Sequence, residues 1–459
     1  MPEPVRRRRS SSSKAFAAPS GAGGSRKVDL RTRVVLGVVP GLLYLAHLTF
    51  GANQPVAALW FTALLALALC IGLIMPQGRI GLFDLRPVIA PAVLFAAVIG
   101  AALWSLTPWT PGGAHPIWAW AGVSPGSTTI NPSATVLEIV KLVGLACVFV
   151  VGCLQGARRD RAASTVDAVL ILGAGYAAIA LLMFLTRTQI MSGGRLSGGF
   201  LSANSAATVF GMLTVLGLAA LLRRWRQSTG LGLADQMSRV ATPLACLLLY
   251  AACLLLTASR MGVVATVIPA ALLLLWETVD GRGGQRRPVL IGGLVLLAVG
   301  GVLMLGGNNL LWERLDRIDA DALTRTTIFA AHWNAFLDSP LFGYGLGSFG
   351  DLNSQIMTRE NYGDLWLIRA AHNVYLQWLE EAGLIGAVPM FALVGLLLGV
   401  AVWRSGQLRS GKTVVRGLIA ASLVVLIHGT TDFGLQVPSI AAFWTFLLGI
   451  QYAYGQSRA

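Results

Sequence analysis

The sequence predicts an all-α membrane protein of about twelve transmembrane helices, with a large, partly helical loop between the ninth and tenth helices. Of the 459 residues, 55% are hydrophobic and only 12% are charged, and the mean hydropathy is +0.69. A soluble protein of this length could not carry so much apolar surface, so many of these side chains must face lipid. The apolar residues gather in runs that are long enough, or nearly so, to cross a bilayer.

These apolar runs define the expected spans and the divisions of the chain. They lie at residues 34–51, 55–75, 87–105, 134–154, 165–185, 203–222, 241–258, 261–277, 288–307, 384–403, 414–430 and 438–455. Residues 1–33 are basic and too polar to pack, and we expect a disordered cytoplasmic tail there. Helices 1–9 would then occupy residues 34–307, a large loop residues 308–383, and helices 10–12 residues 384–459.

Basic residues predict the orientation, because positively charged connections stay on the cytoplasmic side. Every second connection carries such a cluster: Arg79 and Arg86; Arg158, Arg159 and Arg161; Arg223, Arg224 and Arg226; Arg282, Arg286 and Arg287; and Arg404, Arg409, Lys412 and Arg416. Both termini are therefore expected in the cytoplasm and the 308–383 loop on the outer, periplasmic face. Because the net charge of +15 resides in short connections rather than on one folded face, it argues against a nucleic-acid partner.

The outer face also gathers polar residues that could carry chemistry. All five histidines lie at or near it: His47, His115, His332, His372 and His428. The 308–383 loop contains Trp, Tyr and helix-forming stretches such as 321–337, so we expect it to fold as a cap on the bundle. The five cysteines lie within apolar runs, and we expect neither disulfides nor a metal site.

His372 stands where the chain re-enters the membrane after the long loop. A neutral imidazole at that point could act as a general base. Alternatively, His372 and Asn373 cap a helix end, and the nearby Gly383 and Gly386 allow close helix packing. The residues alone favour neither interpretation.

Three arginines on the outer side could bind an anion. Arg260 lies between two apolar runs that almost touch, at the membrane edge, where an arginine is costly unless it binds something anionic. Arg325 and Arg195 face the same side, and several guanidiniums around one histidine suit a phosphate-bearing substrate. For each arginine alone, snorkelling or a local ion pair is the simpler explanation, so the hypothesis rests on the set.

Five short sequence elements form a set around these residues. They are His-Asn-x9-Gly-x-x-Gly at 372–386, Pro-Leu-Phe-Gly-Tyr-Gly within 338–349, Ser259-Arg260-Met-Gly, Gly199 and Phe200 followed by Asn204, and His428 followed by Asp432 and Phe433. The set resembles motifs of the O-antigen ligase and polymerase superfamily over about residues 190–440. One departure is the Met between Arg260 and Gly262, where the family has Ser/Thr-Arg-Gly.

The resemblance implies a metal-independent glycosyltransferase of the bacterial inner membrane that needs no cofactor. Its donor would be an undecaprenyl-pyrophosphate-linked oligosaccharide. Arg260 and Arg325 would hold the pyrophosphate, and His372 would activate an acceptor hydroxyl for inverting attack at the anomeric carbon. The other residues expected in the binding site are Arg195, Asn204, Asn373 and Asp432. The implied partners are the bilayer, the donor, a glycan or lipid acceptor, and other polysaccharide-assembly proteins.

Three alternatives stay open at this point. Ligases and polymerases differ mainly in the acceptor, which these residues do not reveal. A flippase of lipid-linked glycans would need charged residues near the midplane and internal repeats, whereas Glu138 and Lys141 are spaced to pair on one helix face and we interpret them, with Asp167, as structural. A non-catalytic scaffold would be expected to lack the histidine or the arginines.

Overall fold

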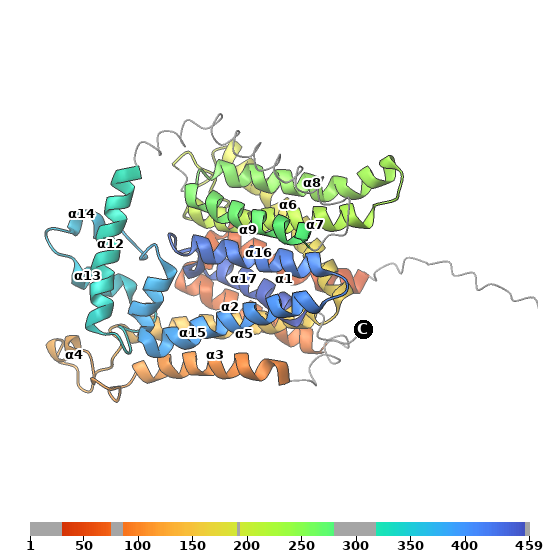
Figure 1. Cartoon of the computed structure of the whole chain (residues 1–459). Coiled ribbons are helices and arrows are strands. Elements are labelled where there is room, and N and C mark those ends of the chain that lie inside the picture. Colours follow the sequence, from red (N-terminus) through yellow and green to blue (C-terminus); the bar gives the residue numbers. More distant parts are fainter. Residues whose placement is uncertain (1–29, 75–85, 191–192, 280–317, 455–459) are drawn as a thin grey trace, which may run out of the picture.

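The protein is helical throughout the part that the computed structural model describes, residues 30–74, 86–190, 193–279 and 318–454 (Figure 1). By length and composition, eight helices within these residues could cross a membrane. They are α2 (Pro55–Ile74), α3 (Arg86–Ser105), α5 (Pro132–Gly156), α6 (Arg159–Leu185), α7 (Ala203–Gln227), α8 (Leu233–Leu256), α9 (Arg260–Val279) and α15 (Val374–Gln407). The chain is therefore a multi-pass membrane protein.

Three further helices complete the bundle: α1 (Leu30–Leu48), α16 (Lys412–His428) and α17 (Pro438–Ala453). All of the expected spans except 288–307 fall on a described helix, and 288–307 lies outside the described residues. The helix α1 begins at Leu30, before the expected start at residue 34, and the rest of the expected basic tail lies outside the described part.

The helix α7 forms the centre of the bundle. In its most apolar stretch 89% of the residues are buried, and it packs against α8, α9 and α16. Small residues allow this crowding: a Cβ added to Gly211 would overlap the Thr266 hydroxyl of α9 and crowd Val424 of α16. Because α7 is enclosed, side chains at its first turn are held at a fixed position.

The helices α5 and α17 approach each other through glycines. Gly152 of α5 faces the backbone of α17 at Phe446, and Gly449 of α17 faces the backbone of α5 at Phe149, so a Cβ at either glycine would overlap a carbonyl oxygen. Helix pairs in membranes use small residues in this way to bring backbones close and to gain van der Waals contact.

The expected cap lies at one end of the bundle (Figure 1). We use "the cap" for residues 318–373, which contain α12 (Ile318–Asp338), α13 (Phe349–Ile356) and α14 (Tyr362–Leu365); α12 covers the stretch 321–337 in which a helix was predicted. The loop before α5, which contains α4 (Pro116–Trp120), supports the cap. In that loop Ile130 N donates to Tyr344 O at 2.9 Å, and Asn131 Nδ2 donates to an Asp351 carboxylate oxygen at 2.8 Å.

The helix α15 is interrupted at Gly383, where φ is +58°. Four hydrogen bonds to the cap fill the break: Leu384 N to Pro340 O at 2.8 Å, Ile385 N to Leu341 O at 3.0 Å, Tyr344 N to Glu380 O at 3.0 Å, and Gly345 N to Glu381 O at 2.8 Å. A side chain at position 383 would overlap Leu341 O. The glycine therefore admits both the left-handed conformation and the close approach of residues 340–345.

The three charged residues that the sequence places within apolar helices each contact an opposite charge. Lys141 contacts Glu138, and Asp167 contacts both Arg223 and Arg224. These contacts agree with the structural interpretation of Glu138, Lys141 and Asp167.

Substituting Gly449 by Val should separate α5 from α17 and destabilise the bundle by roughly 1–3 kcal/mol, because the new methyl groups meet backbone that cannot move aside. We expect a lower melting temperature for the detergent-solubilised protein and less folded protein in the membrane. The matched control is Gly399→Val, a change at an exposed helical glycine with open space around it. Equal melting temperatures for the two variants would contradict this account of the interface.

Candidate active site

Three of the predicted residues form a hydrogen-bonded chain at the cap end of the bundle, and a fourth, His372, lies beside it. Arg195 Nη2 donates to Asn204 Oδ1 at 2.8 Å, and Asn204 Nδ2 donates to Asp432 Oδ1 at 3.4 Å. His372 Nδ1 lies 3.9 Å from the same Asp432 oxygen. Residues that are up to 237 positions apart in the sequence (432 minus 195) are thus brought together.

Arg195 is held at the corner between α8 and α9. Its Nε donates to Thr257 O at 2.7 Å, the carbonyl of the residue that ends α8. On the other side of the corner, the Ser259 hydroxyl accepts from Gly262 N at 3.2 Å and caps α9, whose first residue is Arg260. The corner therefore keeps Arg195 and Arg260 on the same side of the bundle.

Asn204 is fixed by the start of α7. The Ser202 hydroxyl accepts from Asn204 N at 3.2 Å and caps the helix. The preceding loop contacts α1, since a Cβ at Gly199 would overlap the backbone of Leu48, and the buried Phe200 ring lies 5.1 Å from that of His47. The Gly-Phe…Asn element thus fixes the position of the Asn204 amide.

Asp432 is buried between α16 and α17, with only 1% of its side chain exposed. Its Oδ1 accepts from Asn204, whereas Oδ2 has no hydrogen-bond partner among the described residues. One turn earlier, His428 Nδ1 bonds to the Thr208 hydroxyl of α7 at 2.8 Å. His428 therefore links α16 to α7 one helical turn before Asp432 in the sequence.

His372 lies directly before α15 with a left-handed backbone, φ +53°. The turn is secured by Val374 N, which donates to Gly429 O at 2.9 Å, and the Phe433 ring packs against the imidazole with centroids 5.0 Å apart and planes at 76°. About a quarter of the side chain, 27%, is exposed. A substrate can therefore reach the ring.

Burial lowers the pKa of His372, and the positive charge of Arg325 on α12 lowers this pKa further, whereas the Asp432 carboxylate opposes both effects. At neutral pH the imidazole is consequently unprotonated. A neutral imidazole beside a buried carboxylate can accept a proton and be stabilised as imidazolium. Arg325 thus shares an electrostatic environment with His372, as the sequence predicts.

Asn373 caps α15. Its Oδ1 accepts from Tyr375 N at 3.0 Å and from Leu376 N at 3.1 Å. This is the helix-capping role that the sequence left open for Asn373, and it fixes the first turn of α15 next to His372. A contact between Asn373 and a substrate stays a prediction.

Residues 245–391 match the family model described as O-antigen ligase. This segment, about a third of the chain, is similar to O-antigen ligases. The matched segment runs from α8 to α15 and contains Arg260, Arg325 and His372, while Arg195, Asn204 and Asp432 lie outside it and reach the site through the fold. No curated protein matches the chain.

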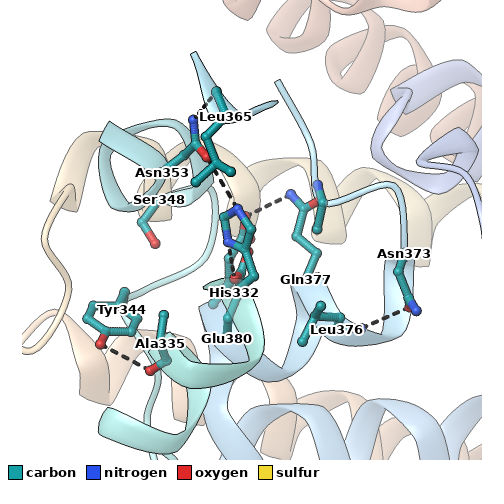
Figure 2. A network of polar contacts seen from close by, with 12 residues as sticks. His332, Ala335, Tyr344, Ser348, Asn353, Leu365, Asn373, Leu376, Gln377 and Glu380 are labelled. Atoms are coloured by element: carbon teal, nitrogen blue, oxygen red, sulfur yellow. Dashed lines mark hydrogen bonds and ion pairs between the residues drawn. The ribbon is translucent and has the colours of Figure 1, made fainter. Parts of the chain in front are cut away.

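Inside the matched segment, the structure adds a polar network that no sequence motif indicates (Figure 2). His332 Nδ1 lies 2.6 Å from Glu380 Oε2, and His332 Nε2 lies 3.3 Å from Asn353 Oδ1. Both His332 and Glu380 are fully buried. The one available signal was the pair of adjacent acids, Glu380 and Glu381, in an otherwise apolar helix, because ionisable residues there need partners.

The environment of His372 can be checked without reference to any activity. Diethyl pyrocarbonate acylates a histidine side chain only when the imidazole is neutral. The pH dependence of His372 acylation, followed by mass spectrometry, therefore reports the pKa of His372. We expect a midpoint below about 6.5. Asp432→Asn should lower the midpoint further because it removes the carboxylate that favours imidazolium, and Arg325→Gln should raise it because it removes a repelling charge.

His115 provides an internal control for this measurement. It is half-buried and caps α4 by accepting from Ile117 N at 3.2 Å, and its own midpoint should be the same in all three proteins. Shifts of His372 in one common direction, or no shift, would contradict the assigned geometry.

Proposed function

We propose that the protein transfers a polyprenyl-pyrophosphate-linked oligosaccharide to an acceptor hydroxyl at the outer face of the bacterial inner membrane. The observation that carries the proposal is the hydrogen-bonded chain from Arg195 through Asn204 to Asp432, with the accessible, neutral His372 3.9 Å from the Asp432 carboxylate. It combines a base, a carboxylate that stabilises the protonated base, and positive charge at one end of a membrane bundle. The match of residues 245–391 to the O-antigen ligase family model supports a glycan-transferring enzyme.

In this proposal, His372 accepts the proton of the acceptor hydroxyl. The hydroxyl oxygen then forms a bond to the anomeric carbon from the face opposite the leaving group, and the bond between that carbon and the phosphate oxygen breaks. The electron pair leaves with the polyprenyl pyrophosphate, and the anomeric configuration inverts. The buried Asp432 carboxylate stabilises the imidazolium that forms.

Arg260 and Arg325 are proposed to neutralise the charge that develops on the pyrophosphate. Fixed guanidiniums in a site that excludes water stabilise such charge more than solvent does. Arg195 adds positive charge and holds Asn204, so its proposed role is partly to orient Asp432. This division of roles requires neither a metal nor a cofactor.

An apolar cavity next to the site supports a lipid-linked substrate. Its volume is about 510 Å³, and helices α2, α3, α5, α15 and α17 line it with side chains such as Phe61, Phe95, Leu145, Leu397 and Leu448. The lining of the cavity includes Val374 and Tyr375, the two residues at the start of α15 that follow the His372 turn. A hydrocarbon chain at this place would present its head group near the imidazole.

The proposed site fits either of two related activities, which differ in the acceptor. If the acceptor is a second lipid-linked glycan, the product is a polymer such as an exopolysaccharide or an O-antigen; if it is a separate lipid or glycan, the reaction is a ligation. The polar chain of the site lies at the cap end, and Glu138, Lys141 and Asp167 within the apolar helices each contact an opposite charge. This arrangement favours an enzyme over a flippase.

His372→Ala should abolish polymer or ligated glycan while the amount of protein in the membrane stays normal. Loss of a general base reduces the rate by roughly 100- to 10,000-fold, so the lipid-linked unit should accumulate on the outer leaflet. The readouts are glycan output by gel and the leaflet position of the lipid-linked unit, and His115→Ala is the matched control. Unchanged product would overturn the role of His372, and a unit stalled on the inner leaflet would indicate a flippase instead.

A further inference from the structure

The helices α12 and α15, near which the proposed residues Arg325 and His372 lie, are joined by the contact between His332 and Glu380. On α12, His332 follows Arg325 by seven residues, which is two helical turns or about 10 Å along one face. On the other side, Glu380 lies in the first segment of α15, which directly follows His372. The contact between His332 and Glu380 therefore joins the same two elements that carry Arg325 and His372.

The pair is short, buried and enclosed. His332 Nδ1 and Glu380 Oε2 are 2.6 Å apart, and neither side chain is exposed. The Phe349 ring stacks on the imidazole, with centroids 4.6 Å apart and planes at 18°. Figure 2 shows the pair between α12 and the first segment of α15. The position of His332 is thus constrained from several directions.

The hydrogen bonds around the pair determine where its protons lie. Asn353 Nδ2 donates to Leu365 O at 2.9 Å, so Asn353 Oδ1 faces His332 and His332 Nε2 is the donor to it. The proton between His332 Nδ1 and Glu380 Oε2 is shared by a base and an acid, and such bonds are strong and directional. An apolar contact would let α12 slide along α15, whereas this bond fixes its register.

We propose that His332 and Glu380 are positioning residues that keep Arg325 of α12 within electrostatic range of His372 at the start of α15. The proposal rests on the function proposed above for Arg325 and His372, and neither His332 nor Glu380 is assigned a contact with substrate. The break of α15 at Gly383 lies three residues after Glu380, and the hydrogen bonds at this break anchor the cap to the same segment. The hydrogen bond between His332 and Glu380 and the break together fix α12 in two directions.

His332→Ala and Glu380→Ala should both move Arg325 away from His372. The charged groups that act on His372 are Arg325 from α12 and Asp432 from the loop after α16, so a more distant Arg325 raises the pKa of His372. The expected result is an upward shift of the diethyl pyrocarbonate midpoint, in the direction of Arg325→Gln. A misplacement of about 1 Å can also cost roughly 100-fold in rate, and we expect it in kcat more than in KM.

Two variants keep the test valid if the alanine variants fold poorly. Glu380→Gln retains a neutral hydrogen bond to Nδ1 and should stay near the wild-type midpoint and rate. The double change of His332→Leu with Glu380→Met fills the space without leaving a buried charge unpaired, so it should fold yet show the raised midpoint and the lowered kcat. Asp351→Ala, which removes a cap contact to Asn131 elsewhere, controls for general loosening of the cap.

The outcomes separate this inference from the proposed function. If the Leu/Met variant has the wild-type midpoint and kcat while Arg325→Gln shifts the midpoint, the positioning role is wrong although the function stands. If Asp351→Ala produces the same shift as the Leu/Met variant, the effect is general loosening and the positioning role is again wrong. If His372→Ala retains glycan transfer, the proposed catalytic role of His372 is wrong, whereas the midpoint shifts in proteins that keep His372 still test the position of Arg325.

Discussion

The break of α15 at Gly383 is the constraint on which the rest of the site depends. A helix in a membrane normally satisfies its own backbone groups, because an unpaired N–H or C=O in lipid costs several kcal/mol. At this break, the carbonyls of Glu380 and Glu381 and the N–H groups of the residues after Gly383 bond instead to residues 340–345. The cap therefore supplies partners that the membrane cannot, and it stays attached to α15 as long as the bundle is folded.

This attachment has consequences for charge as well as for position. His372 is kept neutral by burial and by Arg325, while Asp432 stands ready to stabilise the imidazolium. The carboxylate is itself held by Asn204, and through Asn204 by Arg195. Three separate parts of the bundle, α7, the α16–α17 loop and the start of α15, thus contribute to the environment of one ring. Because α7 is enclosed by its neighbours, these contributions share a rigid reference.

The sequence predicts the described helices better than it predicts the contacts between them. Apolar runs and the shortness of the α8–α9 connection were enough to locate the helices and to place Arg260 at a corner. In contrast, Asn204 and Asp432 are 228 residues apart and His332 and Glu380 are 48 apart, and no local period connects residues at such separations. The spacing Gly383-x-x-Gly386 suggests helix packing, whereas Gly383 is needed for a positive φ at a helix break.

The position of the cavity gives the fold a reason to place the imidazole at a helix start. Transfer of the apolar part of a lipid-linked sugar from water into the membrane lowers the free energy, whereas transfer of its charged part raises it. Its reacting bond must therefore lie at the membrane boundary. The first residues of α15 meet both requirements, since Val374 and Tyr375 line the cavity and His372 precedes them outside it. One turn of backbone, secured by the Asn373 cap and by Gly429, thus separates the proposed lipid site from the proposed base. A base placed further along α15, or further into the cap, would lie away from Asp432.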